Sequence, residues 1–71
     1  MNKYDEKILK RFGEKVNKKR KELLLSQIEL AKAAKLDRTY ISGIERGINN
    51  PSLKNIAKIA QVLKVKPSDL L

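Results

Sequence analysis

The apolar residues of this chain recur every three or four positions, and this spacing predicts helices rather than strands. In the first third of the chain the pattern predicts a helix over residues 6–23, with Asp5 as its cap. The apolar stripe of this helix consists of Leu9, Phe12, Val16 and Leu23, with Ile8 beside it. Its other faces carry mostly lysine and arginine, which we interpret as a solvated basic surface.

A second long stripe lies near the end of the chain and predicts a helix from residue 51 or 52 to residue 63. Asn50 and Ser52 are both suitable caps for this helix. A short connection leads to a terminal turn over residues 67–71, where proline suits the first helical position. The stripe consists of Leu53, Ile56, Ala57, Ala60 and Leu63.

The segment 26–47 between these two helices has the pattern of two short helices joined by a tight turn. Ser26 and Glu29 have the spacing of a capping box, which predicts a helix over residues 27–34. Asp37 is a suitable cap for a helix over residues 38–46, and Gly47 is a suitable stop. Short helices in this arrangement are typical of a helix-turn-helix, in which the second helix reads DNA.

The second of these helices has one apolar face and one polar face. Ile41 and Ile44 form the inward face, and the outward face carries Arg38, Thr39, Tyr40, Ser42 and Arg46. Arg38 stands earliest and is our candidate for reading a guanine, with a phosphate contact as the alternative. Tyr40 can pack on the sugar-phosphate backbone or probe a deformable base step, the alternative being partial burial. The residues around the start of the following helix, which can bind phosphate or simply form a capped surface loop, are Asn49, Asn50, Ser52 and Lys54.

The composition points to a polyanionic partner and away from catalysis. The 71 residues include 17 lysines and arginines against 8 acidic residues, for a net charge of +9. Cysteine and histidine are absent, so disulfides and the common zinc sites are excluded, and we expect no catalytic residues, metal, cofactor or small-molecule ligand. No segment approaches the ~18 apolar residues of a membrane span, and the first residues do not resemble a signal peptide. We therefore expect a cytoplasmic DNA-binding protein.

The segment SQIELAKAAKLDRTYISGIERG, together with the NPSL helix start that follows it, resembles the Cro/repressor-type transcription regulators of bacteria and phages. This resemblance implies a bacterial or phage-encoded protein. The run LDRTYISGIERG is most similar to the controller proteins of restriction–modification systems. The resemblance covers residues 12–71 and implies an all-α, lambda-repressor-like bundle of five helices. We expect a single domain over residues 1–71, with residues 1–4 as a flexible arm.

The resemblance also assigns roles to individual residues. Arg20 and Glu45 stand where this family has a partly buried ion pair, the alternative being two exposed charges. Gln27 stands where the family has a glutamine that meets a phosphate, the alternative being a simple preference for the helix start. Relatives commonly have glycine at three helix ends, so these ends are either strained here or shifted. The residues in question are Leu24, Lys35 and Lys64.

The function implied is that of a homodimeric transcription regulator bound to a pseudo-palindromic operator, as activator or repressor. A phage Cro-like repressor and an antitoxin that also binds a toxin are the alternatives. A basic membrane binder is disfavoured, because one core can use all the apolar stripes. We place the dimer interface within residues 59–71, although Val65 and Leu70 can instead complete the monomer core. Its candidate residues are Ile59, Val62, Val65, Leu70 and Leu71.

Overall fold

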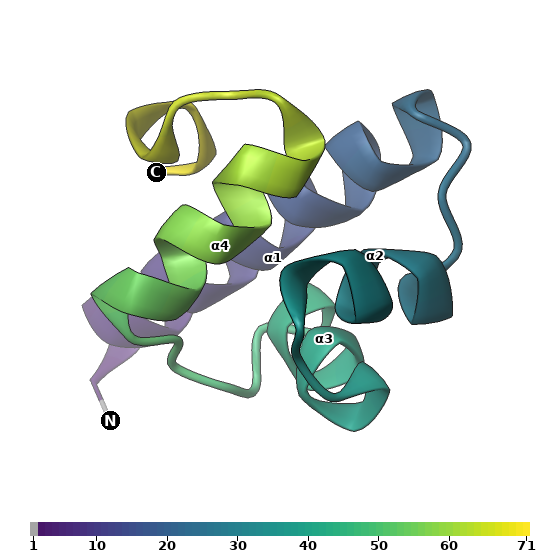
Figure 1. The fold of residues 1–71 in the computed structure, drawn as a ribbon. Coiled ribbons are helices and arrows are strands. Elements are labelled where there is room, and N and C mark those ends of the chain that lie inside the picture. The colour runs from purple at the N-terminus through teal and green to yellow at the C-terminus, as the bar shows by residue number, and fades with distance from the viewer. Residues whose placement is uncertain (1) are drawn as a thin grey trace.

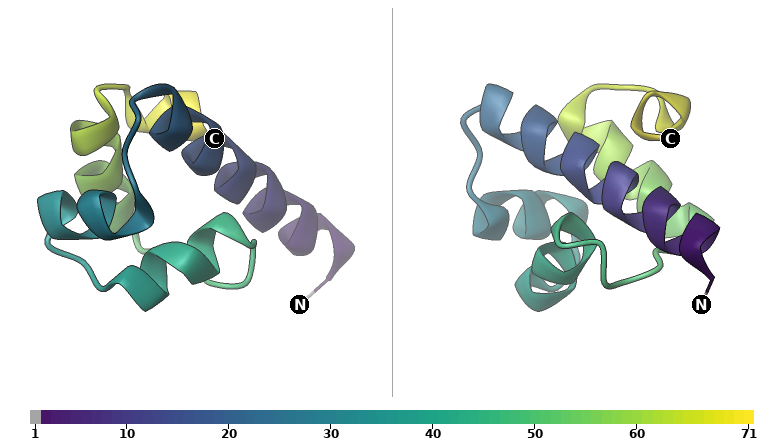
Figure 2. Two further views of the ribbon diagram at one scale, coloured as in Figure 1. Left: turned by 90° about the vertical axis from the view of Figure 1, so that its right-hand side faces the viewer. Right: turned by 180° about the vertical axis from the view of Figure 1, so that it is seen from behind.

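The computed structural model describes residues 2–71, which form four α-helices and a terminal 3-10 helix, η1. The elements are α1 Lys3–Glu22, α2 Gln27–Ala34, α3 Arg38–Glu45, α4 Leu53–Leu63 and η1 Pro67–Leu70. Helices α1 and α4 form two sides of the molecule, η1 closes one end between them, and α3 lies at the opposite end (Figures 1 and 2). The all-α fold is confirmed, but the fifth helix is a single 3-10 turn, so the predicted count of five α-helices is wrong.

The first helix begins earlier than the sequence pattern predicted. Asn2 rather than Asp5 is the cap of α1, because the Asn2 side-chain oxygen accepts a hydrogen bond from the Asp5 backbone N–H at 2.9 Å. Both residue types cap helices well, and an acidic residue in the first turn also favours the helix dipole. The predicted arm over residues 1–4 is therefore wrong from Lys3 onward, and Met1 lies outside the described residues.

The core is formed by one apolar face from each helix and by Leu70 of η1. In α4 this face differs from the predicted stripe, because Leu53 is 82% exposed and Ile59 is fully buried. Positions 56, 59, 60 and 63 follow the i, i+3, i+4, i+7 spacing of a single helical face, and Leu53 and Ala57 lie outside it. The core residues include Phe12, Val16, Leu30, Ala31, Ile41, Ile44, Ile56, Ile59, Ala60, Leu63 and Leu70. None of the helices described in residues 2–71 is long and apolar enough to cross a membrane.

Helices α1 and α3 cross at Gly13, where the two backbones are in close contact. A Cβ atom at this position would collide with the backbone carbonyl oxygens of Ile44 and Glu45. Glycine inside a helix costs about 1 kcal/mol relative to alanine. Here the absence of a side chain at Gly13 lets the end of α3 pack directly against α1, which a larger residue would prevent.

A buried ion pair joins the same two helices. Arg20 of α1 donates from Nε to Glu45 Oε2 at 2.6 Å and from Nη2 to Glu45 Oε1 at 2.9 Å. Their side chains are 10% and 4% exposed, so both charges are largely withdrawn from water. The Glu45 Oε1 atom also accepts from Asn17 at 2.8 Å and from Gln27 of α2 at 3.1 Å. One carboxylate of α3 is thus bound by donors from both α1 and α2.

These contacts keep Glu45 ionised. Burial alone would raise the pKa of Glu45, but hydrogen bonds from Arg20, Asn17 and Gln27 and the charge of Arg20 outweigh it, so the pKa lies below its usual range. The hydrogen bond and charge of Glu45 in turn raise the pKa of Arg20 despite its burial. Arg20 also donates from Nη1 to the Leu25 carbonyl at 2.8 Å. The same guanidinium group therefore also binds the loop between α1 and α2.

The three helix ends that lack the glycine of related proteins all adopt the left-handed conformation. The φ angles are 59° at Leu24, 57° at Lys35 and 60° at Lys64, and Gly47 has a φ of 75° after α3. The backbone hydrogen bonds are those of a glycine-terminated helix: after α1, for example, the Leu25 N–H reaches the Arg20 carbonyl at 3.1 Å. The helix ends are therefore not shifted, and three side chains bear the left-handed strain.

Replacing Glu45 with alanine tests how strongly the ion pair holds the fold. We expect Glu45→Ala to lower the free energy of unfolding by about 3–5 kcal/mol, because Arg20 is left buried without a counter-charge. Urea denaturation monitored by circular dichroism measures the change. Glu22→Ala is the matched control, since Glu22 pairs at 3.5 Å with Lys19 on an exposed face. This control should cost less than about 1 kcal/mol, and equal losses in the two variants would contradict the account.

Replacing Leu24 with glycine tests the strain at the end of α1. Leu24 is 89% exposed, so its side chain contributes little packing that could be lost. We expect Leu24→Gly to raise the free energy of unfolding by about 0.5–1 kcal/mol, because relief of the left-handed strain exceeds the added chain entropy. Lys21→Gly, inside the last turn of α1, should instead destabilise by about 1 kcal/mol. Destabilisation by both substitutions would show that Leu24 is unstrained.

Candidate nucleic-acid interface

The outward face of α3 is fixed by the burial of its inward face. Ile41 and Ile44 are 0% and 1% exposed, and this leaves Arg38, Thr39 and Arg46 exposed on the other side of the helix. The Arg46 Nε atom lies 3.4 Å from the Ser42 carbonyl oxygen, so this side chain runs back along its own helix. Arg38 and Thr39 stand in the first turn and extend freely toward solvent.

Helix α2 and the turn after it hold α3 at a defined angle. The capping box is present, because Ser26 Oγ accepts from the Glu29 N–H at 3.0 Å and Glu29 Oε1 accepts from the Ser26 N–H at 2.8 Å. The turn closes where the Leu36 N–H donates to the Ala31 carbonyl at 2.8 Å. Asp37 is the N-cap residue of α3 by position, although its side chain makes no capping hydrogen bond. The two helices form a helix-turn-helix with α3 at the surface (Figure 2).

Tyr40 is half-buried and is bound from two directions. Its hydroxyl accepts a hydrogen bond from the Asn55 side chain of α4 at 2.9 Å. Its backbone carbonyl accepts from the Asn49 side chain at 3.2 Å. Asn49 lies over Gly43, where a Cβ atom would collide with the Asn49 side chain. Tyr40 is therefore partly buried, and its hydroxyl lies at the junction of α3 and α4.

The other polar candidates are divided between the surface and the interior. The Gln27 side chain is directed inward to Glu45, and Asn50 lines a hollow of about 150 Å³ beside Asp5 and the first turns of α1. Ser52 caps α4, since its Oγ accepts from the Asn55 N–H at 3.2 Å, and Asn50 is not the cap. Lys54 is exposed in the first turn of α4.

The residues chosen for a dimer interface differ in burial. Ile59 and Leu70 are 0% and 2% exposed and belong to the monomer core, so their assignment to an interface is wrong. The reason is that η1 folds back between α1 and α4 and buries Leu70 inside the monomer. Val62 and Val65 are half-buried against this core, and Leu71 is 52% exposed.

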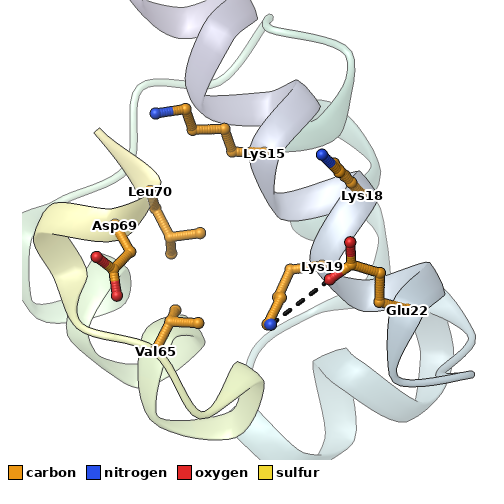
Figure 3. Close-up of a pocket in the computed structure, with 7 residues that line it drawn as sticks. All are labelled: Lys15, Lys18, Lys19, Glu22, Val65, Asp69 and Leu70. Atoms are coloured by element: carbon orange, nitrogen blue, oxygen red, sulfur yellow. Dashed lines mark ion pairs between the residues drawn. The ribbon is translucent and has the colours of Figure 1, made fainter.

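A hollow of about 380 Å³ lies between the second half of α1 and η1 (Figure 3). Both elements lie on the side of the molecule away from α3 (Figure 1). Val65 and Leu70 point into it from one side (Figure 3). Charges of both signs line the rest of it, namely Lys15, Lys18, Lys19, Glu22 and Asp69. The surface around this hollow therefore combines partly covered apolar groups with charges of both signs. It differs in this respect from the surface of α3, which is predominantly basic.

Two residues with clear roles were missed in the sequence. Asn17 binds Glu45, and its position one helical turn before Arg20 places both on the same face, so the spacing could have revealed it. Asn55 binds Tyr40 from the first turn of α4, and no pattern in the sequence indicates that contact.

Comparisons with known proteins agree on one family. The profile of the helix-turn-helix family matches residues 16–70. Control protein C.BamHI of Bacillus amyloliquefaciens is 52% identical over 61 residues, which cover 84% of this chain and 75% of the relative.

Solved structures give the same result. The restriction–modification controller protein C.AhdI of Aeromonas hydrophila matches with a TM-score of 0.86 and 43% identity, covering 89% of this chain and 96% of that one. SinR, a master regulator for biofilm formation solved in complex with DNA, matches with a TM-score of 0.80 and 37% identity, covering 83% of this chain and 95% of that one. Since the family profile covers most of the sequence, this chain belongs to the helix-turn-helix family and is a DNA-binding transcription regulator, not an enzyme.

Proposed function

We propose that this protein is a dimeric controller of a restriction–modification system that binds a pseudo-palindromic operator. The observation that carries the proposal is the 52% identity to control protein C.BamHI, in a chain whose α3 presents Arg38 and Thr39 on an exposed, rigidly supported face. We expect the operator upstream of its own gene and of an endonuclease gene.

The first turn of α3 enters the major groove in this proposal. Arg38 donates to the O6 and N7 atoms of a guanine, and the Thr39 methyl group packs against a thymine methyl. Ser42 and Arg46 lie beside the sugar-phosphate backbone, and Tyr40 probes a deformable base step. At the start of α2 the Gln27 backbone N–H supplies a phosphate contact, since its side chain is bound to Glu45. At the start of α4 the phosphate contacts come from Asn49, Asn50, Ser52 and Lys54. The likeness to SinR, which was solved in complex with DNA, supports DNA as the partner of this chain.

The dimer in this proposal forms across the hollow between α1 and η1. Val65, which lines this hollow, and Leu71, which follows the lining residue Leu70, supply its apolar part. Val62 lines a separate hollow beside the end of α2, and Ile59 and Leu70 are already used in the monomer core. The lysines and acidic residues around the hollow can pair with their opposites when a two-fold axis passes through this surface. Two recognition helices then lie about one DNA turn apart, roughly 34 Å.

The genes beside this one test the controller role. Adjacent methyltransferase and endonuclease genes, with a nuclease footprint of the purified protein on the duplex upstream of its own gene, are the expected finding. A neighbouring toxin gene whose product co-purifies with this chain would replace the controller by an antitoxin. Phage lysogeny genes on both sides would replace it by a Cro-like repressor.

Substituting Arg38 tests the reading of the operator. We expect Arg38→Ala to weaken binding to the specific site by about 1–3 kcal/mol and to relax the preference at one base position. Fluorescence anisotropy with operator and scrambled duplexes at fixed salt measures both affinities. Arg11→Ala, which removes an exposed arginine from α1, is the control and should leave the ratio of the two affinities unchanged. Equal weakening on both duplexes by Arg38→Ala would make Arg38 a phosphate contact.

Substituting Leu71 tests the dimer without disturbing the core. We expect Leu71→Glu to shift the protein from dimer to monomer in sedimentation velocity at micromolar concentration, because it buries a charge at the interface. Leu24→Glu introduces the same charge at a side chain that is 89% exposed, and this control should remain dimeric. A dimer that persists in Leu71→Glu, or a wild-type monomer on a palindromic site, would place the interface elsewhere.

A further inference from the structure

The Tyr40–Asn55 hydrogen bond is the side-chain bond between α3 and α4 that lies at the proposed DNA surface. The Asn55 amide donates to the Tyr40 hydroxyl oxygen at 2.9 Å, and both residues are half-buried. Arg38 and Thr39, which precede Tyr40, are exposed and have no comparable anchor on another helix in residues 2–71. The ring of Tyr40 is therefore held in place from α4, and the first turn of α3 is fixed at its third residue.

The direction of this bond determines what the hydroxyl can do next. Because Asn55 donates, this bond occupies a lone pair of the Tyr40 hydroxyl oxygen. The proton of the Tyr40 hydroxyl is not used in the bond and remains free. A hydroxyl that keeps its proton is a donor, and DNA presents acceptors as phosphate oxygens and as ring nitrogens and carbonyls of the bases. The side chain of Asn55 thus sets both the position of the hydroxyl and its role as a donor.

We propose that Asn55 is a positioning residue for DNA recognition, which holds the Tyr40 hydroxyl as a hydrogen-bond donor toward one acceptor of the operator. The proposal rests on the proposed function, since it concerns the same DNA-binding surface. Asn55 acts through Tyr40 and not through a contact of its own. A rigid donor contributes more to discrimination than a mobile one, because less side-chain entropy is lost on binding.

Asn49 serves as a comparison for Asn55, because it also binds Tyr40 but at the backbone carbonyl instead of the hydroxyl. Its side chain donates to the Tyr40 backbone carbonyl at 3.2 Å and has no part in the hydroxyl contact. Loss of Asn49 should therefore act independently of the Tyr40 hydroxyl. Loss of Asn55 should depend on that hydroxyl completely.

A double-mutant cycle on DNA binding separates these two cases. Duplexes are first selected by the wild-type protein from a library with a randomised core, and the affinity ratio between a selected and a scrambled duplex is then measured by fluorescence anisotropy. We expect Asn55→Ala and Tyr40→Phe each to lower this ratio about two- to tenfold, the range of a single hydrogen bond. The double variant should be no lower than Tyr40→Phe alone. Asn49→Ala should lower the ratio by the same factor in both the wild-type and the Tyr40→Phe background.

Asn55→Asp provides a second variant of nearly the same shape, and its added charge suits the first turn of α4. Its carboxylate cannot donate to the hydroxyl and instead accepts the tyrosine proton, so we expect a similar loss in the affinity ratio. Losses from Asn55→Ala and Tyr40→Phe that multiply, or an unchanged ratio in both Asn55 variants, would overturn the proposal. A wild-type protein that selects no duplex at all would overturn the proposed function itself.

Discussion

The arrangement of the helix-turn-helix depends on one buried carboxylate. Glu45, at the last residue of α3, accepts hydrogen bonds from Arg20 and Asn17 of α1 and from Gln27 of α2. A buried charge is tolerated only when its hydrogen bonds are satisfied, and here three donors and one opposite charge meet that condition. Any displacement of α3 relative to α1 or α2 would break at least one of these bonds. The position of the recognition helix is therefore set by polar contacts as much as by the small apolar core.

This constraint explains why so small a protein can present a rigid surface to DNA. A core of this size contributes only a few kcal/mol, which leaves little to spare for holding surface groups in place. The close contact at Gly13 brings the backbone of α3 against α1, and the Glu45 network fixes the rotation of α3 about that contact. At the other end of α3, the Asn55 contact holds Tyr40. Both ends of the recognition helix are thereby anchored on other helices.

Much of this structure is encoded locally and could be predicted from the sequence. The capping box at Ser26 gives the bounds of α2 correctly, and the turn between α2 and α3 follows from the helix stop and start signals. The three helix ends without glycine lie where the resemblance placed them, and each has a positive φ. These features depend on neighbouring residues alone, so local rules are sufficient to find them.

The parts that were not predicted depend on contacts between distant residues. Asn2 and Asp5 compete as caps of α1, and the pattern alone cannot choose between two good caps. The inward face of α4 and the burial of Ile59 and Leu70 follow from the way in which η1 folds back onto α1 and α4. The role of Asn55 likewise requires the tertiary structure, because it binds Tyr40 on another helix and no spacing within α4 indicates that contact.

The pH dependence of stability tests the central role of Glu45 most directly. The pKa of Glu45 is lowered in the folded protein, so its stabilising effect is present above the unfolded pKa of about 4.3 and is lost as the pH falls through the lower folded value. Urea unfolding of the wild-type protein and of Glu45→Gln between pH 7 and acid measures this effect, because all other acidic groups titrate in both proteins. The wild type should be more stable than Glu45→Gln at pH 7, and this advantage should shrink steadily on acidification. An advantage that is absent at pH 7, or constant across the whole range, would contradict it.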